Sequence, residues 1–109
     1  MPQWSFSSNE AAFHAILQQY NVKLVCCSHW TAYDLYNYQG VWFVTSAAGG
    51  WMVLDNTAYN PPYRGNFYHF AQITVYEAGG IEIRLHRPVL GQASYNAYDY
   101  RIGDPSSFE

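Results

Sequence analysis

The side chains best suited to chemistry in this sequence are its four histidines, His14, His29, His69 and His86. None of them is paired with another at a spacing typical of metal ligands, such as H-x-H, H-x3-H or H-E-x-x-H. The sequence also has no G-x-S-x-G elbow, no phosphate-binding glycine loop and no C-x-x-C pair. Local spacing alone therefore assigns no reaction.

His29 is the strongest candidate because of its position. It follows the small residue Ser28 just past the end of an apolar segment, and it opens an aromatic loop from Trp30 to Tyr36. In open α/β sheets ligands gather at such strand ends. A lone histidine in a loop can equally form a structural hydrogen bond, so both interpretations stay open.

A helix over residues 8–20 is the first element expected to position these groups. Its apolar residues recur at helical spacing: Phe13, Ile16, Leu17 and Tyr20. Ser7 with Glu10 fits a capping box, and Asn21 suits the left-handed conformation that ends helices. His14 falls on the opposite, wetter face, so we expect it at the surface.

Two strands should follow the helix. Residues 22–27 and 41–45 are short apolar runs without alternation, which is typical of strands covered on both faces. Cys26 and Cys27 are neighbours and would point to opposite faces of the first strand, so they are poorly placed to bond to each other. We expect two reduced thiols with a packing role.

The clearest element is a hairpin of residues 68–77 and 81–87 around Ala78-Gly79-Gly80, since glycine pairs suit tight hairpin turns. The expected core-facing residues are Ile73, Val75, Ile81, Ile83 and Leu85. Pro88 should end the second strand, and the tail 91–109 suggests an irregular edge strand. These elements predict one domain, residues 1–109, of the α/β class: a mixed α+β sandwich half with one N-terminal helix, two buried strands, an antiparallel hairpin and an irregular C-terminal tail.

Composition excludes some partners. The net charge is −3 and no basic stripe is present, which argues against nucleic acid. No apolar run approaches the roughly 18 residues of a membrane span, and MPQWSFSSNE lacks the features of a secretion signal, so we expect a cytoplasmic chain. Only 12% of residues are charged while 19% are aromatic, which favours self-association or a partner protein.

A family resemblance extends these inferences. The segment ILQQYNV is followed by the strand LVCC, then Ser28-His29-Trp30-Thr31, an aromatic loop, and the strand GVWFVTSAAG. This order resembles the last conserved block of the calcineurin-like metallophosphoesterases, especially the purple-acid-phosphatase branch. There, a leu-leu-x-x-tyr-x-val helix end precedes a buried strand ending in Gly-His-x-His, and a Gly-Val-x-x-Val-x-Ser-Gly-x-Gly strand follows. Tyr68-His69-Phe70 resembles the start of the closing strands, so the likeness covers about residues 12–88.

The departures from the family pattern limit what the resemblance implies. In the family, both histidines of Gly-His-x-His ligate a dinuclear metal centre that activates water and clamps the phosphoryl group. Here Ser28 replaces the glycine and Thr31 replaces the second histidine, so only His29 carries over, as a remnant metal ligand. The ligand-binding residues implied for the old site are Trp30, Thr31, Tyr33 and Asp34. The D-x-H, G-D-x-x-D and G-N-H motifs of the family's N-terminal half are missing from the sequence.

The resemblance thus implies a metallophosphoesterase-related domain that lacks a complete dinuclear site and is not catalytically competent alone. We expect no cofactor for the isolated chain, and a divalent Zn, Fe or Mn ion would need ligands from another chain. The family packs two sheets face to face with helices outside, so half of it would expose an apolar sheet face. A homodimer or a partner chain should cover that face, making the protein an assembly or binding unit.

Two alternatives stay open. One is an aromatic-rich module of unrelated fold that binds a small ligand or a protein. Its platform would comprise Trp30, Tyr33, Tyr36, Tyr38, Trp42 and Trp51. The other is a stand-alone hydrolase that uses His29 or His69 with a carboxylate such as Asp34.

Overall fold

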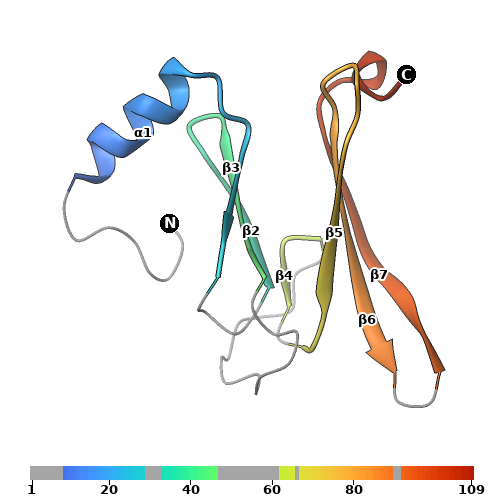
Figure 1. Ribbon diagram of the computed structural model, residues 1–109. Helices are drawn as coiled ribbons and strands as arrows, with labels where there is room; N and C mark the ends of the chain where they lie inside the picture. Colours follow the sequence, from blue (N-terminus) through green and yellow to red (C-terminus); the bar gives the residue numbers. More distant parts are fainter. Residues whose placement is uncertain (1–8, 29–32, 47–61, 66, 90–91) are drawn as a thin grey trace.

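The computed structural model describes residues 9–28, 33–46, 62–65, 67–89 and 92–109. In chain order they form α1 (Glu10–Gln19), β1 (Leu24–Cys27), β2 (Tyr33–Tyr38), β3 (Val41–Ser46), β4 (Arg64–Gly65), β5 (Phe70–Val75), β6 (Ile81–Val89), β7 (Gln92–Ile102) and the 3-10 helix η1 (Pro105–Phe108). The strands build two sheets that lie face to face, with α1 on the outer side of the first (Figure 1). The expected mixed α+β class is confirmed.

The first sheet has the strand order β1-β3-β2-β4. Its centre is the antiparallel pair β2–β3, which turns through Gln39 and Gly40, both with positive φ. β1 runs parallel to β3, with Leu24 opposite Trp42. The prediction of an aromatic loop from Trp30 to Tyr36 is thus wrong from Tyr33 onward, because that segment belongs to β2.

β1 also differs from the expectation. It is an edge strand of the first sheet, and its residues are only partly covered, with Cys26 exposed. The prediction of a strand covered on both faces is therefore wrong for residues 22–27. It holds for β3, where Val44 is buried on one face and Val41 and Thr45 on the other. An apolar run does not distinguish an edge strand from a central one.

Helix α1 packs against the turn between β2 and β3. Its N-cap is Asn9, in the left-handed conformation and with no side-chain capping bond, so the capping box of Ser7 with Glu10 is wrong. Asn21 has a φ of 54° and ends the helix as expected. The prediction that His14 lies at the surface is wrong, because the end of β2 covers it. Its Nε2–H donates to the carbonyl oxygen of Tyr38 over 2.9 Å. No helix in the described part of the chain has the length and apolar character that crossing a membrane requires.

The second sheet is the antiparallel series β5-β6-β7. The expected hairpin is confirmed as β5–β6, with Gly79 at a φ of 102° in its turn. The tail forms β7, an edge strand with register shifts against β6. Pro88 does not end β6: it lies at the register shift between Arg87 and Val89, where its missing N–H interrupts no regular ladder. η1 then closes over the hairpin turn, where Gly80 N–H donates to the carbonyl oxygen of Ser107.

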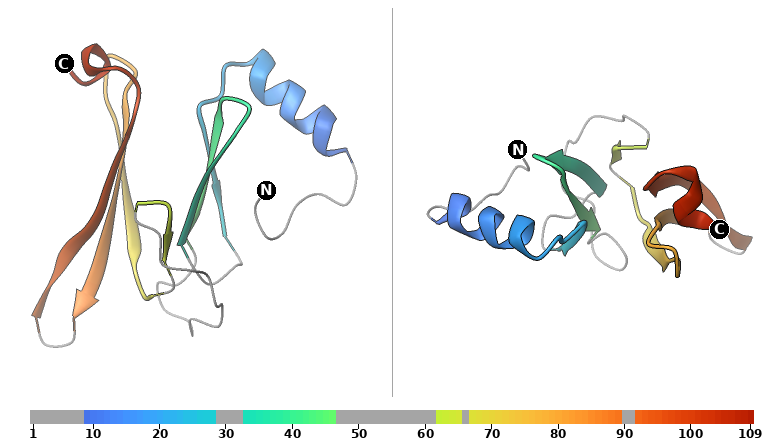
Figure 2. Two further views of the ribbon diagram at one scale, coloured as in Figure 1. Left: turned by 180° about the vertical axis from the view of Figure 1, so that it is seen from behind. Right: turned by 90° about the horizontal axis from the view of Figure 1, so that it is seen from above.

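The hydrophobic core lies between the two sheets. Its buried members are Tyr33, Leu35, Val44, Phe67, Ile83 and Leu85. Trp42 of the first sheet also meets Tyr100 of the second edge to face, with ring centres 4.9 Å apart. Figure 2 shows the resulting layers in the order helix, first sheet, second sheet.

One prediction about the core is wrong. Ile83 and Leu85 are buried as expected, but Ile73 and Val75 of β5 are exposed. The alternation placed them on the same face as Ile83, and the register agrees, with Ile73 opposite Ile83 and Val75 opposite Ile81. They stay exposed because β5 is the edge strand of its sheet.

Candidate functional site

The residues predicted for a site around His29 are only partly described. His29, Trp30 and Thr31 lie outside the described residues. Tyr33 and Asp34 begin β2 and are buried, but as neighbours on a strand they point to opposite faces of the sheet. Tyr33 faces the second sheet and meets the His69 ring edge to face at 5.7 Å. Asp34 faces outward, so one pocket does not receive both side chains.

Asp34 forms an ion pair with a residue of the neighbouring strand. Its Oδ1 accepts a hydrogen bond from Arg64 Nε over 2.9 Å, and the two residues are opposite each other in β2 and β4. Burial raises the pKa of the Asp34 carboxyl, and the charge and hydrogen bond of Arg64 only partly offset this. Asp34 therefore depends on Arg64 for its charge compensation.

The aromatic platform is also divided between surfaces. Tyr36 and Tyr38 are an odd number of positions from Tyr33 in β2, so their side chains lie on the opposite, outer face of the first sheet. Trp42 packs inward against Tyr100. Trp30 and Trp51 lie outside the described residues. The described aromatics therefore do not form one continuous face.

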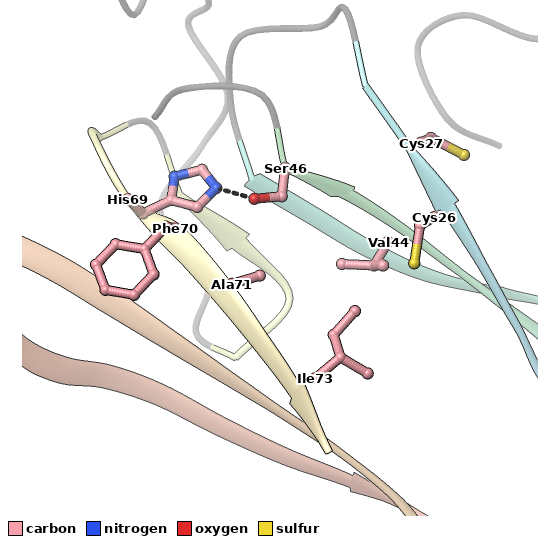
Figure 3. Close-up of a pocket in the computed structure, with 8 residues that line it drawn as sticks. All are labelled: Cys26, Cys27, Val44, Ser46, His69, Phe70, Ala71 and Ile73. Atoms are coloured by element: carbon pink, nitrogen blue, oxygen red, sulfur yellow. Dashed lines mark hydrogen bonds between the residues drawn. The ribbon is translucent and has the colours of Figure 1, made fainter. Parts of the chain in front are cut away.

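A pocket of about 290 Å³ lies where the two sheets meet along their edge strands β1 and β5. It is lined by Cys26, Cys27, Val44, Ser46, His69, Phe70, Ala71 and Ile73. Figure 3 shows Cys26 and Ile73 extending from β1 and β5 into the space between the sheets, with Ser46 and His69 at its other end. The pocket thus has an apolar part and a polar end.

Ser46 and His69 are joined at that polar end. Ser46 Oγ and His69 Nε2 are 2.9 Å apart, and His69 Nδ1 is 2.9 Å from the carbonyl oxygen of Phe67. A carbonyl oxygen can only accept, so Nδ1 carries the hydrogen of the neutral ring and Nε2 accepts from the Ser46 hydroxyl. The backbone therefore fixes the tautomer of His69.

The surroundings of His69 keep it neutral. Only 1% of its surface is exposed, and this burial lowers the pKa of His69, although the Phe67 carbonyl opposes the shift. The rings of Tyr33 and Phe67 contact it edge to face. A neutral imidazole whose Nε2 lone pair points at a serine hydroxyl can accept the proton of that hydroxyl.

Both cysteines line the pocket, and only the Cys26 thiol extends into it (Figure 3). Both are free, as the sequence predicted. Burial, and to a smaller extent the neighbouring Cys26, raise the pKa of the Cys27 thiol, which keeps it protonated near neutral pH.

The described residues do not supply the metal centre that the resemblance implies. No three His, Cys, Asp or Glu side chains come together as a ligand set among them. His69, the histidine among the described residues that line the pocket, uses both nitrogens in the hydrogen bonds to Ser46 and Phe67. These residues do not fit a dinuclear site.

Sequence patterns missed the part that Ser46 plays. Ser46 ends β3 of the first sheet and His69 precedes β5 of the second, 23 positions later, so no local spacing marks them as a pair. The hydrolase alternative named His69, but with Asp34, which instead binds Arg64 on the other face of the sheet. Neither the family models nor the curated proteins and solved structures compared with this chain give a match.

Proposed function

We propose that this chain is an assembly domain related to the C-terminal half of the calcineurin-like metallophosphoesterases, and that it functions by joining a second copy of itself. Two features support the relationship: the motif order around His29, and the packing of sheets with a helix outside. The apolar sheet faces expected to need a second chain pack against each other within this one, so the assembly role rests on a strand edge instead. Ser28 and Thr31, at the positions of a glycine and a metal-binding histidine in the family, argue against a complete dinuclear centre within one chain.

The observation that carries the proposal is the edge strand β5. It contains no charged residue, and Phe70, Ile73 and Val75 along it are exposed. Exposed edge strands pair readily with other strands, and proteins usually prevent this with charged side chains, above all lysine. β5 has no such protection.

A second copy is the partner that fits this edge best. Antiparallel pairing of β5 with β5 across a two-fold axis would place identical uncharged strands together and extend the sheet from three strands to six. The exposed side chains of Ile73 and Val75 would then pack against those of the second copy on one face of the sheet, and Phe70 on the other. A partner of opposite charge is not required, because the strand is its own complement.

The proposal is tested by measuring oligomeric mass and metal content on one purified sample. Light scattering after size exclusion should give twice the mass of the chain, and elemental analysis should give no stoichiometric metal. A monomer at all concentrations would refute the assembly role. A dimer with stoichiometric zinc, iron or manganese would refute the absence of a metal centre and direct attention to ligands shared between copies.

The Val75→Lys variant should convert the dimer to a monomer. Val75 is 71% exposed at the end of β5, so pairing along the whole strand would place one lysine near each end of the interface. A lysine on an edge strand opposes pairing, because its charge would lose water against the apolar side chains of the partner strand, and two such lysines should raise the dissociation constant by about 100-fold. The matched control is Ile16→Lys, which introduces the same side chain at an exposed apolar residue of α1. Equal dissociation of both variants would show that β5 is not the interface.

A further inference from the structure

We propose that Ser46 and His69 form a nucleophile and general-base pair that hydrolyses small uncharged carboxylic esters bound in the pocket between β1 and β5. This activity needs no metal, and the pocket shares Phe70 and Ile73 with the β5 surface proposed for assembly. It rests on four observations: the geometry of the pair, the fixed tautomer, the burial of the base and the character of the pocket.

The geometry meets the first requirement of nucleophilic catalysis by serine. A serine hydroxyl is a weak nucleophile unless a base removes its proton, and that base must lie within hydrogen-bond reach. The separation of 2.9 Å between Ser46 Oγ and His69 Nε2 satisfies this condition. Ser46 also lines the pocket, with its Oγ beside His69 at the polar end (Figure 3).

A third group orients the base. In serine hydrolases a hydrogen-bond acceptor on Nδ1 holds the imidazole in the productive tautomer and stabilises the imidazolium that forms. The Phe67 carbonyl oxygen has this position relative to His69. It lies only two residues away in the chain, so the local backbone holds the ring in place. The lowered pKa of His69 keeps its Nε2 available at neutral pH.

The pocket determines the class of substrate. Its volume of about 290 Å³ is at the lower end of ligand pockets, which favours a small molecule. Val44, Ala71 and Ile73 supply an apolar wall for an acyl chain. None of the eight described lining residues is Lys, Arg, Asp or Glu, so these residues offer no countercharge to an anionic substrate such as a phosphate ester. An uncharged ester with a short acyl chain fits this lining.

The reaction has two steps that balance. Ser46 Oγ attacks the ester carbonyl carbon while its proton passes to His69 Nε2, and the bond from the carbonyl carbon to the alcohol oxygen then breaks. The alcohol takes that proton as it leaves, and Ser46 is acylated. Water next attacks the acyl carbon and gives a proton to His69, which returns it to Ser46 Oγ as the carboxylic acid departs. The net change is ester plus water to acid plus alcohol.

The test uses p-nitrophenyl butyrate as substrate and an alkyl fluorophosphonate as label. The full chain should release p-nitrophenolate, and intact-mass and peptide analysis should place a single phosphonyl group on Ser46. Ser46→Ala should lower the rate of ester hydrolysis by about 100-fold or more. The control Ser106→Ala removes an exposed hydroxyl that hydrogen-bonds Asp104 and has no histidine beside it, so its rate should be unchanged.

The pH profile separates catalysis from a structural role. The rate of labelling should rise with pH as His69 becomes neutral. It should be half-maximal below about pH 6.5, the ordinary pKa of histidine, because burial lowers the pKa of His69. Labelling of wild-type protein needs no variant, so it remains decisive if Ser46→Ala fails to fold. A label found elsewhere, or no label on folded wild-type protein, would overturn the proposal. Repeating the labelling on the Val75→Lys variant separates the chemistry from any covering of the pocket by a second copy at β5.

Discussion

Replacing Ile83 with alanine should lower the free energy of unfolding by about 3 kcal/mol. Ile83 is 1% exposed and packs in the core cluster with Leu85 and with residues of the first sheet, including Tyr33 and Val44. The loss has two parts: the free energy of transferring the removed methyl and methylene groups out of water, and the cost of the cavity that remains because two opposed sheets cannot easily close over it. Urea unfolding followed by tryptophan fluorescence measures it.

Ile73→Ala is the matched control, because the chain offers the same residue type directly opposite. Ile73 pairs with Ile83 in the β5–β6 register and lies on the same face, but it is 37% exposed. Its loss should cost about 1 kcal/mol, since the removed groups are already partly hydrated. Both changes are best measured in the Val75→Lys background, so that association through β5 does not contribute. Equal losses would mean that the edge position of β5 is wrong.

Ile73 and Ile83 show which part of the packing the sequence predicts and which part it does not. Alternation correctly places Ile73 and Ile83 on one face, since neighbouring strand residues point in opposite directions. Alternation does not say where a strand lies in its sheet. The strand order places β6 in the centre and β5 at the edge, and this difference in position accounts for the difference in burial.

The elements that could be predicted are those stabilised by local sequence. The β5–β6 hairpin follows from its glycine turn, and the end of α1 follows from Asn21 in the left-handed conformation. β2 could not be predicted in the same way. Its sequence YDLYNY contains Asp34 and Asn37, which are disfavoured in strands, and Asp34 is compensated there by Arg64 from a distant part of the chain.

The candidate site shows the same limit. His69 can be named from sequence as one of four histidines, but its base character comes from burial between the sheets and from its bonds to Ser46 and Phe67. His14 illustrates the opposite error. Helical spacing predicts it on the wet face, yet the β2–β3 turn lies over that face and supplies the Tyr38 carbonyl as its partner.

Arg64→Ala should destabilise the protein by about 2 to 3 kcal/mol at neutral pH, because it leaves the Asp34 carboxylate buried without its cation. The Asp34 side chain is 2% exposed and that of Arg64 is 43% exposed, so the loss should lie below that of a fully buried pair. The matched control is Arg84→Ala. Arg84 has a similar exposure of 42% and a 2.9 Å contact with Asp99, which is 46% exposed and stays hydrated. Its second contact, with Glu82 over 3.9 Å, is the weaker one, because Glu82 keeps Arg101 at 2.9 Å, so stability should hardly change.

The pH dependence of this loss distinguishes an uncompensated charge from lost packing. The pKa of Asp34 in the folded protein is already raised by burial, and removing Arg64 removes two causes that lower it, so the pKa rises further. A carboxyl whose folded pKa exceeds its unfolded pKa binds its proton more readily when folded, so its contribution to stability grows as pH falls. The deficit of Arg64→Ala should therefore shrink as the pH falls from neutrality towards the ordinary range of an aspartate, about pH 4, measured by urea unfolding. A deficit that stays constant over this range would assign the stabilisation to the aliphatic stem of Arg64 rather than to its charge.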